Sequence, residues 1–138
     1  MEAEWTEDLT VGVEKIDRQH QEIFKRIATL RAALRGGDAR SEVERTLEFL
    51  EQYVTEHFSM EETYMRRFSY HGILAHRSEH EGFIRDFTEF KGKWKDQNAR
   101  NEITSFLELQ MARRFSAWLV EHIAKVDKEL GAFLADKL

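Results

Sequence analysis

The stretch from Val43 to Phe68, VERTLEFLEQYVTEHFSMEETYMRRF, has apolar residues at the spacing of one long amphipathic helix. Its stripe consists of Val43, Leu47, Leu50, Val54, Met65 and Phe68. Residues three and four positions apart lie on the same face of a helix. His57 falls on this stripe between Val54 and Met65, and Glu61 shares its face. The predicted helix therefore carries an imidazole and a carboxylate on the face that it buries.

Three further segments have the same spacing and predict three more helices. The first is predicted to begin near Asp17, as an N-cap, and to end at Gly36-Gly37. Another runs from Ile73 to Trp94 and is followed by a polar break at residues 95–101. The last begins near Ile103, and Gly131 marks its end or a kink. Residues 1–16 show no sustained repeat and predict an N-terminal arm packed on the body.

Four amphipathic helices with short connections favour one architecture, since short connections make sequential neighbours antiparallel. We therefore predict an all-α fold, an up-down-up-down antiparallel four-helix bundle over about residues 17–130, with a short C-terminal tail. The length of 138 residues fits a single domain, residues 1–138.

Composition excludes several kinds of site and partner. The absence of cysteine excludes disulfides, thiolate metal sites and cysteine nucleophiles. A net charge of −5 argues against nucleic acid as the main partner. No apolar run approaches the ~20 residues that span a bilayer, and the acidic beginning MEAEWTEDLT is unlike a signal peptide. We expect a cytoplasmic protein that binds neither nucleic acid nor membranes.

Histidine is placed on the inward face of every predicted helix. Of the six histidines, five lie on apolar stripes: His20, His57, His76, His80 and His122. His71 falls in the predicted turn at residues 69–72. A buried imidazole without a partner is costly. Mutual hydrogen bonds would not readily satisfy five rings, whereas neutral imidazole suits iron, zinc, copper or nickel. The pattern therefore predicts a metal site inside the bundle.

Two carboxylates could complete the ligand set. Glu61 follows His57 by one helical turn and shares its face, whereas Glu62 is rotated about 100° away and is expected in solvent. Asp127 lies about 140° from His122 on a regular helix, so the two side chains would not meet. A π-bulge or an irregular turn between them would bring Asp127 inward. The alternative is a surface aspartate in a tail of mixed charge.

Four segments together resemble the hemerythrin family in its short bacterial form. They are WTEDLTVGVEKIDRQH (residues 5–20), HFSMEE (57–62), HRSEH (76–80) and WLVEHIAKVD (118–127). The family pattern has a histidine on the first helix, then H-x-x-x-E, H-x-x-x-H and H-x-x-x-x-D on the following three. The turn Tyr70-His71 departs from the Tyr-Pro pair of many bacterial relatives. This departure concerns the rigidity of the turn and leaves the metal pattern complete.

The resemblance implies a non-haem diiron centre that binds dioxygen reversibly, for carriage, storage or sensing. It implies that His76, His80 and His122 bind one iron and that His20 and His57 bind the other. Glu61 and Asp127 would bridge the two ions, together with a bridging oxo or hydroxo group. Side chains near these ligands are candidates for an oxygen pocket: Ile23, Phe24, Leu50, Val54 and Trp118.

Other functions remain open at the level of the sequence. A diiron enzyme is one alternative, as an oxidase, a peroxidase or a protein that handles nitric oxide. An iron buffer and a plain helical interaction module are two others. Diiron oxidases use four carboxylates and Glu-x-x-His pairs, and no histidine here follows a glutamate by three residues. We therefore expect reversible binding and no enzymatic turnover.

Overall fold

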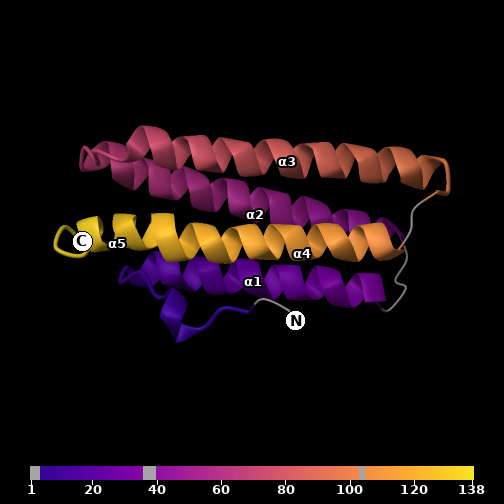
Figure 1. Ribbon diagram of the computed structural model, residues 1–138, viewed down its shortest axis with the longest axis horizontal. Helices are drawn as coiled ribbons and strands as arrows, with labels where there is room; N and C mark the ends of the chain where they lie inside the picture. Colours follow the sequence, from indigo (N-terminus) through magenta and orange to yellow (C-terminus); the bar gives the residue numbers. More distant parts are fainter. Residues whose placement is uncertain (1–3, 36–39, 103–104) are drawn as a thin grey trace.

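The computed structural model describes residues 4–35, 40–102 and 105–138. Four long helices run side by side in alternating directions (Figure 1). They are α1 (Glu14–Arg35), α2 (Arg40–Arg67), α3 (Ile73–Ala99) and α4 (Ser105–His122). A π-helical turn, η2 (Ile123–Asp127), follows α4 directly and leads into α5 (Lys128–Leu134). The predicted up-down-up-down four-helix bundle is confirmed.

The core lies along the shared axis of the four helices, and the apolar stripes of the sequence face it. Leu47, Leu50 and Val54 of α2 are buried, as are Phe83, Phe87 and Trp94 of α3. From α1 and α4 the core receives Ile23, Ile27, Leu30, Phe115 and Leu119. The apolar stripe of each helix is therefore buried against its neighbours in the bundle.

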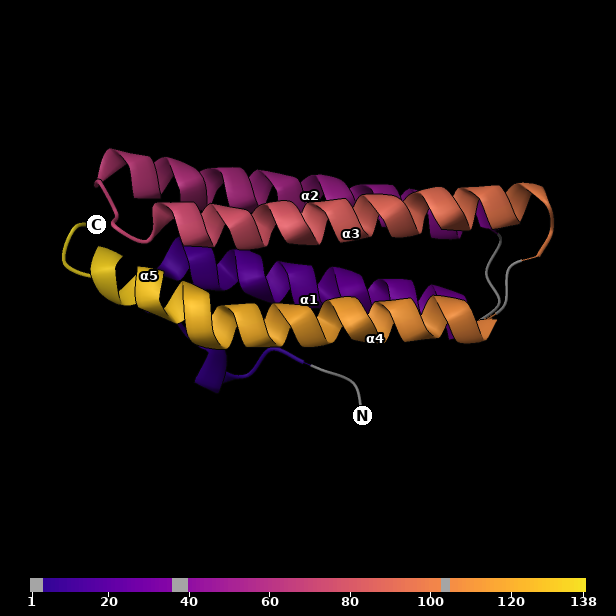
Figure 2. The ribbon, with the colours of Figure 1, turned by 45° about the horizontal axis from the view of Figure 1, so that its top comes forward.

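The N-terminal arm packs along the outside of the bundle beside α1 and α4, as Figures 1 and 2 show. It contains a short 3-10 turn, η1 (Glu7–Leu9), and Gly12 at a φ of 94°, a conformation that favours glycine. The first helix begins at Glu14, earlier than the predicted start at Asp17. Asp17 is therefore not the N-cap. Its carboxylate instead accepts hydrogen bonds from the amides of Val11 (2.8 Å) and Gly12 (3.3 Å) and so fastens the arm.

One other boundary differs from the prediction. The predicted polar break at residues 95–101 is helical up to Ala99, and Lys95 on this last part of α3 pairs with Glu44 and Glu48 of α2. Asn101, at a φ of 57°, lies beyond the end of α3. The predicted helix end at Gly36-Gly37 and the predicted start at Ile103 lie outside the described residues.

Gly131 neither ends nor kinks a helix, in contrast to the prediction. It lies buried inside α5, where a Cβ atom would collide with the backbone carbonyl of Val11. The glycine thus allows the arm to approach the helix closely. In the part of the chain that the structure describes, no helix is both long and apolar enough to cross a membrane.

Candidate metal centre

The seven side chains predicted as ligands converge at one end of the bundle. His20 comes from α1, His57 and Glu61 from α2, His76 and His80 from α3, His122 from α4 and Asp127 from η2. This end contains the α2–α3 turn and the end of α4 (Figure 2). All seven residues are at most 2 % exposed. Five imidazoles and two carboxylates are therefore buried together in the interior of the bundle.

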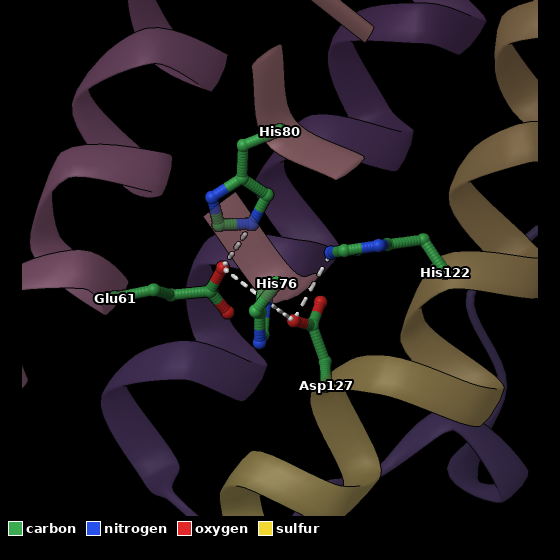
Figure 3. Close-up of side chains that lie close together, drawn as sticks. All are labelled: Glu61, His76, His80, His122 and Asp127. Atoms are coloured by element: carbon green, nitrogen blue, oxygen red, sulfur yellow. Dashed lines mark ion pairs between the residues drawn. The ribbon is translucent and has the colours of Figure 1, made fainter. Parts of the chain in front are cut away.

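Each carboxylate points one oxygen toward each half of the cluster. Asp127 Oδ1 lies 2.9 Å from His76 Nε2 and 3.2 Å from His122 Nε2, as drawn in Figure 3. Its Oδ2 lies 3.1 Å from His20 Nε2. Glu61 divides in the same way, with Oε1 3.1 Å from His80 Nε2 and Oε2 3.4 Å from His57 Nε2. The cluster thus has a three-histidine half (His76, His80, His122) and a two-histidine half (His20, His57), and both carboxylates face both halves.

Asp127 reaches the cluster because the chain forms a π-helical turn over Ile123–Asp127. A π-helical turn takes more residues than an α-helical turn, so a side chain five positions on returns to the same face. Of the two readings that the sequence left open for Asp127, the π-bulge is confirmed and the surface aspartate is wrong: the residue is 1 % exposed.

The buried histidines and carboxylates of the cluster shift one another's pKa values. Burial by itself lowers the pKa of His20, but the carboxylates of Asp127 and Glu61 outweigh it and raise that pKa to about 9. The same balance raises the pKa of His76 to about 9. Burial raises the pKa of the Glu61 carboxyl, but His57, His20 and His76 together hold it well below its usual range. Burial and the charge of Glu61 raise the pKa of Asp127, but His122 and His20 outweigh both and lower it.

The arrangement of the donor atoms suits metal binding better than hydrogen bonding among the side chains themselves. Among the described residues, the Nε2 atoms of all five histidines and all four carboxylate oxygens are buried without a well-formed hydrogen bond. Their atoms gather instead around two points. Glu61, His76, His80, His122 and Asp127 form one group that could hold an ion, and His20, His57, Glu61 and Asp127 form the other. In each group the ligand atoms lie within 4.8 Å of one another.

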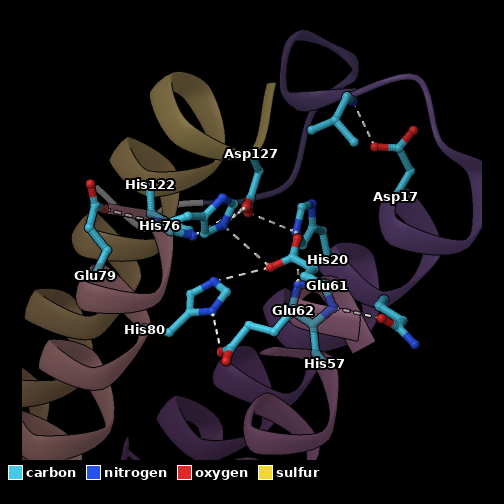
Figure 4. A network of polar contacts seen from close by, with 12 residues as sticks. Asp17, His20, His57, Glu61, Glu62, His76, Glu79, His80, His122 and Asp127 are labelled. Carbon is cyan, nitrogen blue, oxygen red and sulfur yellow. Dashed lines mark hydrogen bonds and ion pairs between the residues drawn. The ribbon is translucent and has the colours of Figure 1, made fainter. Parts of the chain in front are cut away.

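Three of the histidines are hydrogen-bonded through Nδ1, the ring nitrogen away from the cluster, to side chains that the sequence analysis did not predict as their partners (Figure 4). His57 Nδ1 lies 2.6 Å from Gln19 Oε1, and His122 Nδ1 lies 2.8 Å from Glu79 Oε1. His80 Nδ1 lies 3.0 Å from Glu62 Oε2. Glu62 was predicted to lie in solvent. The structure shows it only partly exposed, because His80 of α3 contacts its carboxylate. The only feature of the sequence that could have indicated these three partners is that each is a polar residue directly beside a candidate ligand.

Two aromatic rings cover the three-histidine half. Phe58 stacks on His80, with ring centroids 3.8 Å apart, and Trp118 stacks on His122 at 4.5 Å. Trp118, predicted as an oxygen-pocket residue, thus contacts the three-histidine half. The other pocket candidates, Ile23, Phe24, Leu50 and Val54, are buried on α1 and α2, the helices that bear His20 and His57. His71 lies exposed in the α2–α3 turn, outside the cluster, as predicted.

Comparison with known proteins agrees with this geometry. The family model described as Hemerythrin HHE cation binding domain matches residues 11–134. The chain belongs to the hemerythrin family. Among hemerythrin-family relatives, a bacteriohemerythrin of Pseudomonas paraeruginosa is 32 % identical over 124 residues, covering 89 % of this chain and 75 % of the relative. A bacteriohemerythrin of Methylococcus capsulatus is 32 % identical over 121 residues, covering 86 % of each chain.

Solved hemerythrin structures share the fold. The crystal structure of a wild-type hemerythrin superimposes with a TM-score of 0.81 at 30 % identity, covering 95 % of this chain and 96 % of the other. The crystal structure of a hemerythrin mutant gives a TM-score of 0.82 at 29 % identity, covering 98 % of this chain and 99 % of the other. The likeness therefore extends over nearly the whole hemerythrin bundle.

Proposed function

We propose that this chain, as a single hemerythrin-like domain, binds dioxygen reversibly at a non-haem diiron centre, for carriage, storage or sensing. One observation carries the proposal: two groups of buried donors share the same pair of carboxylates, each with one oxygen toward each group. The names of the bacteriohemerythrin relatives support it. A cytoplasmic location stays a prediction.

The proposed ligands follow the two halves of the cluster. His76, His80 and His122 would hold one iron, His20 and His57 the other, and Glu61 and Asp127 would bridge them with an oxo or hydroxo group. Bridging requires a carboxylate whose oxygens face different ions, and the orientations of Glu61 and Asp127, each with one oxygen toward each half, support this role. A pair of ferrous ions supplies the two electrons that reversible dioxygen binding requires.

The two halves are unequal, which suits binding of a small ligand at one of them. The three-histidine half has five residues around it and the two-histidine half has four. A position with fewer protein donors can accept an external ligand, as open coordination positions do in reactive metal sites. We therefore place dioxygen at the two-histidine half, where Ile23, Phe24, Leu50 and Val54 are the proposed pocket residues.

The surrounding side chains favour binding over turnover. The seven proposed ligands are at most 2 % exposed, so bulk water and dissolved reductants have little access. The set contains only two carboxylates, whereas carboxylate-rich diiron proteins use four. Fewer anionic ligands stabilise highly oxidised iron less. For this reason we propose a binding protein and no enzymatic reaction.

An optical experiment tests the proposal directly. The purified protein is loaded with ferrous iron without oxygen, exposed to air and then deoxygenated again. We expect absorption bands that appear with air and disappear when oxygen is removed, at two iron ions per chain. Bands that persist would indicate irreversible oxidation and contradict reversible binding. A reductant consumed catalytically under air would instead support the diiron-enzyme alternative.

A further inference from the structure

The three side chains behind the histidines follow one rule of placement. Gln19 adjoins His20 on α1 and bonds His57 on α2. Glu62 adjoins Glu61 on α2 and bonds His80 on α3. Glu79 adjoins His80 on α3 and bonds His122 on α4. Each partner thus sits next to one proposed ligand and reaches a histidine of the following helix, so the three bonds link all four helices around the cluster (Figure 4).

These bonds determine which ring nitrogen faces the metal position. A carboxylate or an amide oxygen can only accept a hydrogen bond, so the histidine Nδ1 must carry the proton and donate it. The lone pair then lies on Nε2, the atom that points into the cluster in all three residues. A partner of this kind fixes both the tautomer and the orientation of a metal-binding histidine.

The partners differ in charge between the two halves. Both partners in the three-histidine half, Glu62 and Glu79, are carboxylates, whereas Gln19 in the two-histidine half is a neutral amide. A carboxylate partner increases the basicity of the imidazole that donates to it, and an amide does so less. Glu62 is itself held by Arg77, whose Nε lies 3.3 Å from Glu62 Oε1. The charges of Glu62 and Glu79 and the neutrality of Gln19 therefore add to the difference in donor strength between the two halves.

We propose that Glu62 and Glu79 are positioning residues that make the three-histidine half the tighter metal position, while neutral Gln19 leaves the two-histidine half weaker and easier to reduce. The inference rests on the ligand assignment of the proposed function. It gives a role to two glutamates whose side chains are 20 % and 44 % exposed and that would otherwise count as solvated charges. What distinguishes them from ordinary surface glutamates is that each meets a ring that is itself buried.

Metal titration tests this role without reference to oxygen. Metal-free protein is titrated with Co²⁺ against a competing chromophoric chelator, which resolves a tighter and a weaker binding step. We expect Glu62→Gln and Glu79→Gln each to weaken the tighter step by on the order of tenfold, the usual effect of removing such a partner. Gln keeps an oxygen acceptor of the same shape, so the substitution removes mainly the charge. Gln19→Glu should strengthen the weaker step.

Matched controls separate this role from general surface charge. Glu81→Gln removes an exposed carboxylate that pairs with Arg77 but bonds no histidine. Glu121→Gln removes one that adjoins His122 but pairs with Lys125. Both should leave the two Co²⁺ affinities within about twofold. The melting temperature of the metal-free Glu62→Gln variant should stay near that of the unsubstituted protein, since a merely structural role would lower it.

A second measurement uses the iron-loaded protein. Because a carboxylate partner favours the more oxidised metal, Glu62→Gln and Glu79→Gln should shift its reduction potential to more positive values, and Gln19→Glu to more negative ones. Two Co²⁺ ions bound with unchanged affinities in both Glu variants would overturn the inference and leave the proposed function standing. Unsubstituted protein that binds no metal would overturn the proposed function, and the inference with it.

Discussion

His122 and Asp127 turn toward the same point inside the bundle, with His122 Nε2 3.2 Å from Asp127 Oδ1. The π-helical turn over Ile123–Asp127 makes this possible. A π-helical turn is uncommon and is often found at functional sites. Here it brings a carboxylate to a position where its second oxygen also reaches His20, at 3.1 Å. The π-helical turn therefore places Asp127 where it contacts histidines of both halves of the cluster.

This arrangement predicts that both carboxylates are needed for assembly of the metal centre. Asp127→Ala and Glu61→Ala should each lower metal affinity by more than about tenfold, because each removes donors from both halves at once. Metal content after iron loading and dialysis, measured by elemental analysis, checks this. Tyr53→Phe is the control, since Tyr53 lies outside both donor groups. Equal iron content in all three variants would contradict the bridging role.

Helical periodicity was sufficient to predict the bundle and most of the cluster. His57 with Glu61 and His76 with His80 are four positions apart, and a regular helix brings such pairs to one face. Helical periodicity could not decide whether Asp127 faces the cluster, because residues five positions apart share a face only in a π-helical turn. The position of Glu62 also depended on contacts between helices, since its partner His80 belongs to α3. Such contacts leave no periodic pattern in the sequence.

Gly131 illustrates a second limit of sequence reasoning. A glycine near the end of a helical pattern indicates a terminus or a kink, and we expected one of these. The structure shows that the glycine makes room for Val11 of the arm. The arm has no periodic pattern of its own, so nothing local to residue 131 indicates that another segment packs there.

The raised pKa values of two histidines in the cluster predict that the stability of the metal-free protein depends on pH. His20 and His76 have a folded-state pKa of about 9, above the ordinary value of 6.5. Protonation of these two residues therefore stabilises the fold fully below pH 6.5, and the stabilisation is lost as the pH rises through about 9. Melting temperatures of metal-free protein between about pH 6.5 and 9.5 should fall by roughly 2–5 °C for each kcal/mol lost.

The metal-bound protein provides the control for this pH dependence. Metal binding displaces the protons from the histidines, so the loaded protein should lose much less stability over the same range. At low pH the direction reverses. Glu61 and Asp127 have lowered pKa values, so their contribution is present above the ordinary carboxyl range and is lost as the pH falls below it. A metal-free melting temperature that stays constant from about pH 6.5 to 9.5 would rule out protonated histidines in the cluster.

The contact between Asp17 and the arm predicts a local effect on stability. Asp17→Ala removes the acceptor for the amides of Val11 and Gly12, and burying such groups unpaired costs about 1–3 kcal/mol. The arm should then detach more often. We expect faster cleavage by a protease within residues 4–13, together with a lower urea midpoint. Asp8→Ala, at an exposed position of the arm, should change neither measurement.

Gly131→Ala should destabilise the protein although alanine favours helix formation. Its Cβ would collide with the carbonyl of Val11, so the arm or α5 must shift, at a cost of about 1–3 kcal/mol. Gly92→Ala is the matched control, because Gly92 is also inside a helix, is exposed and has no atom within 4 Å of the added Cβ. That change should stabilise the fold by about 0.5–1 kcal/mol. Urea unfolding of both variants measures the two effects with opposite signs, and a stabilised Gly131→Ala variant would show that the arm does not press on α5 in solution.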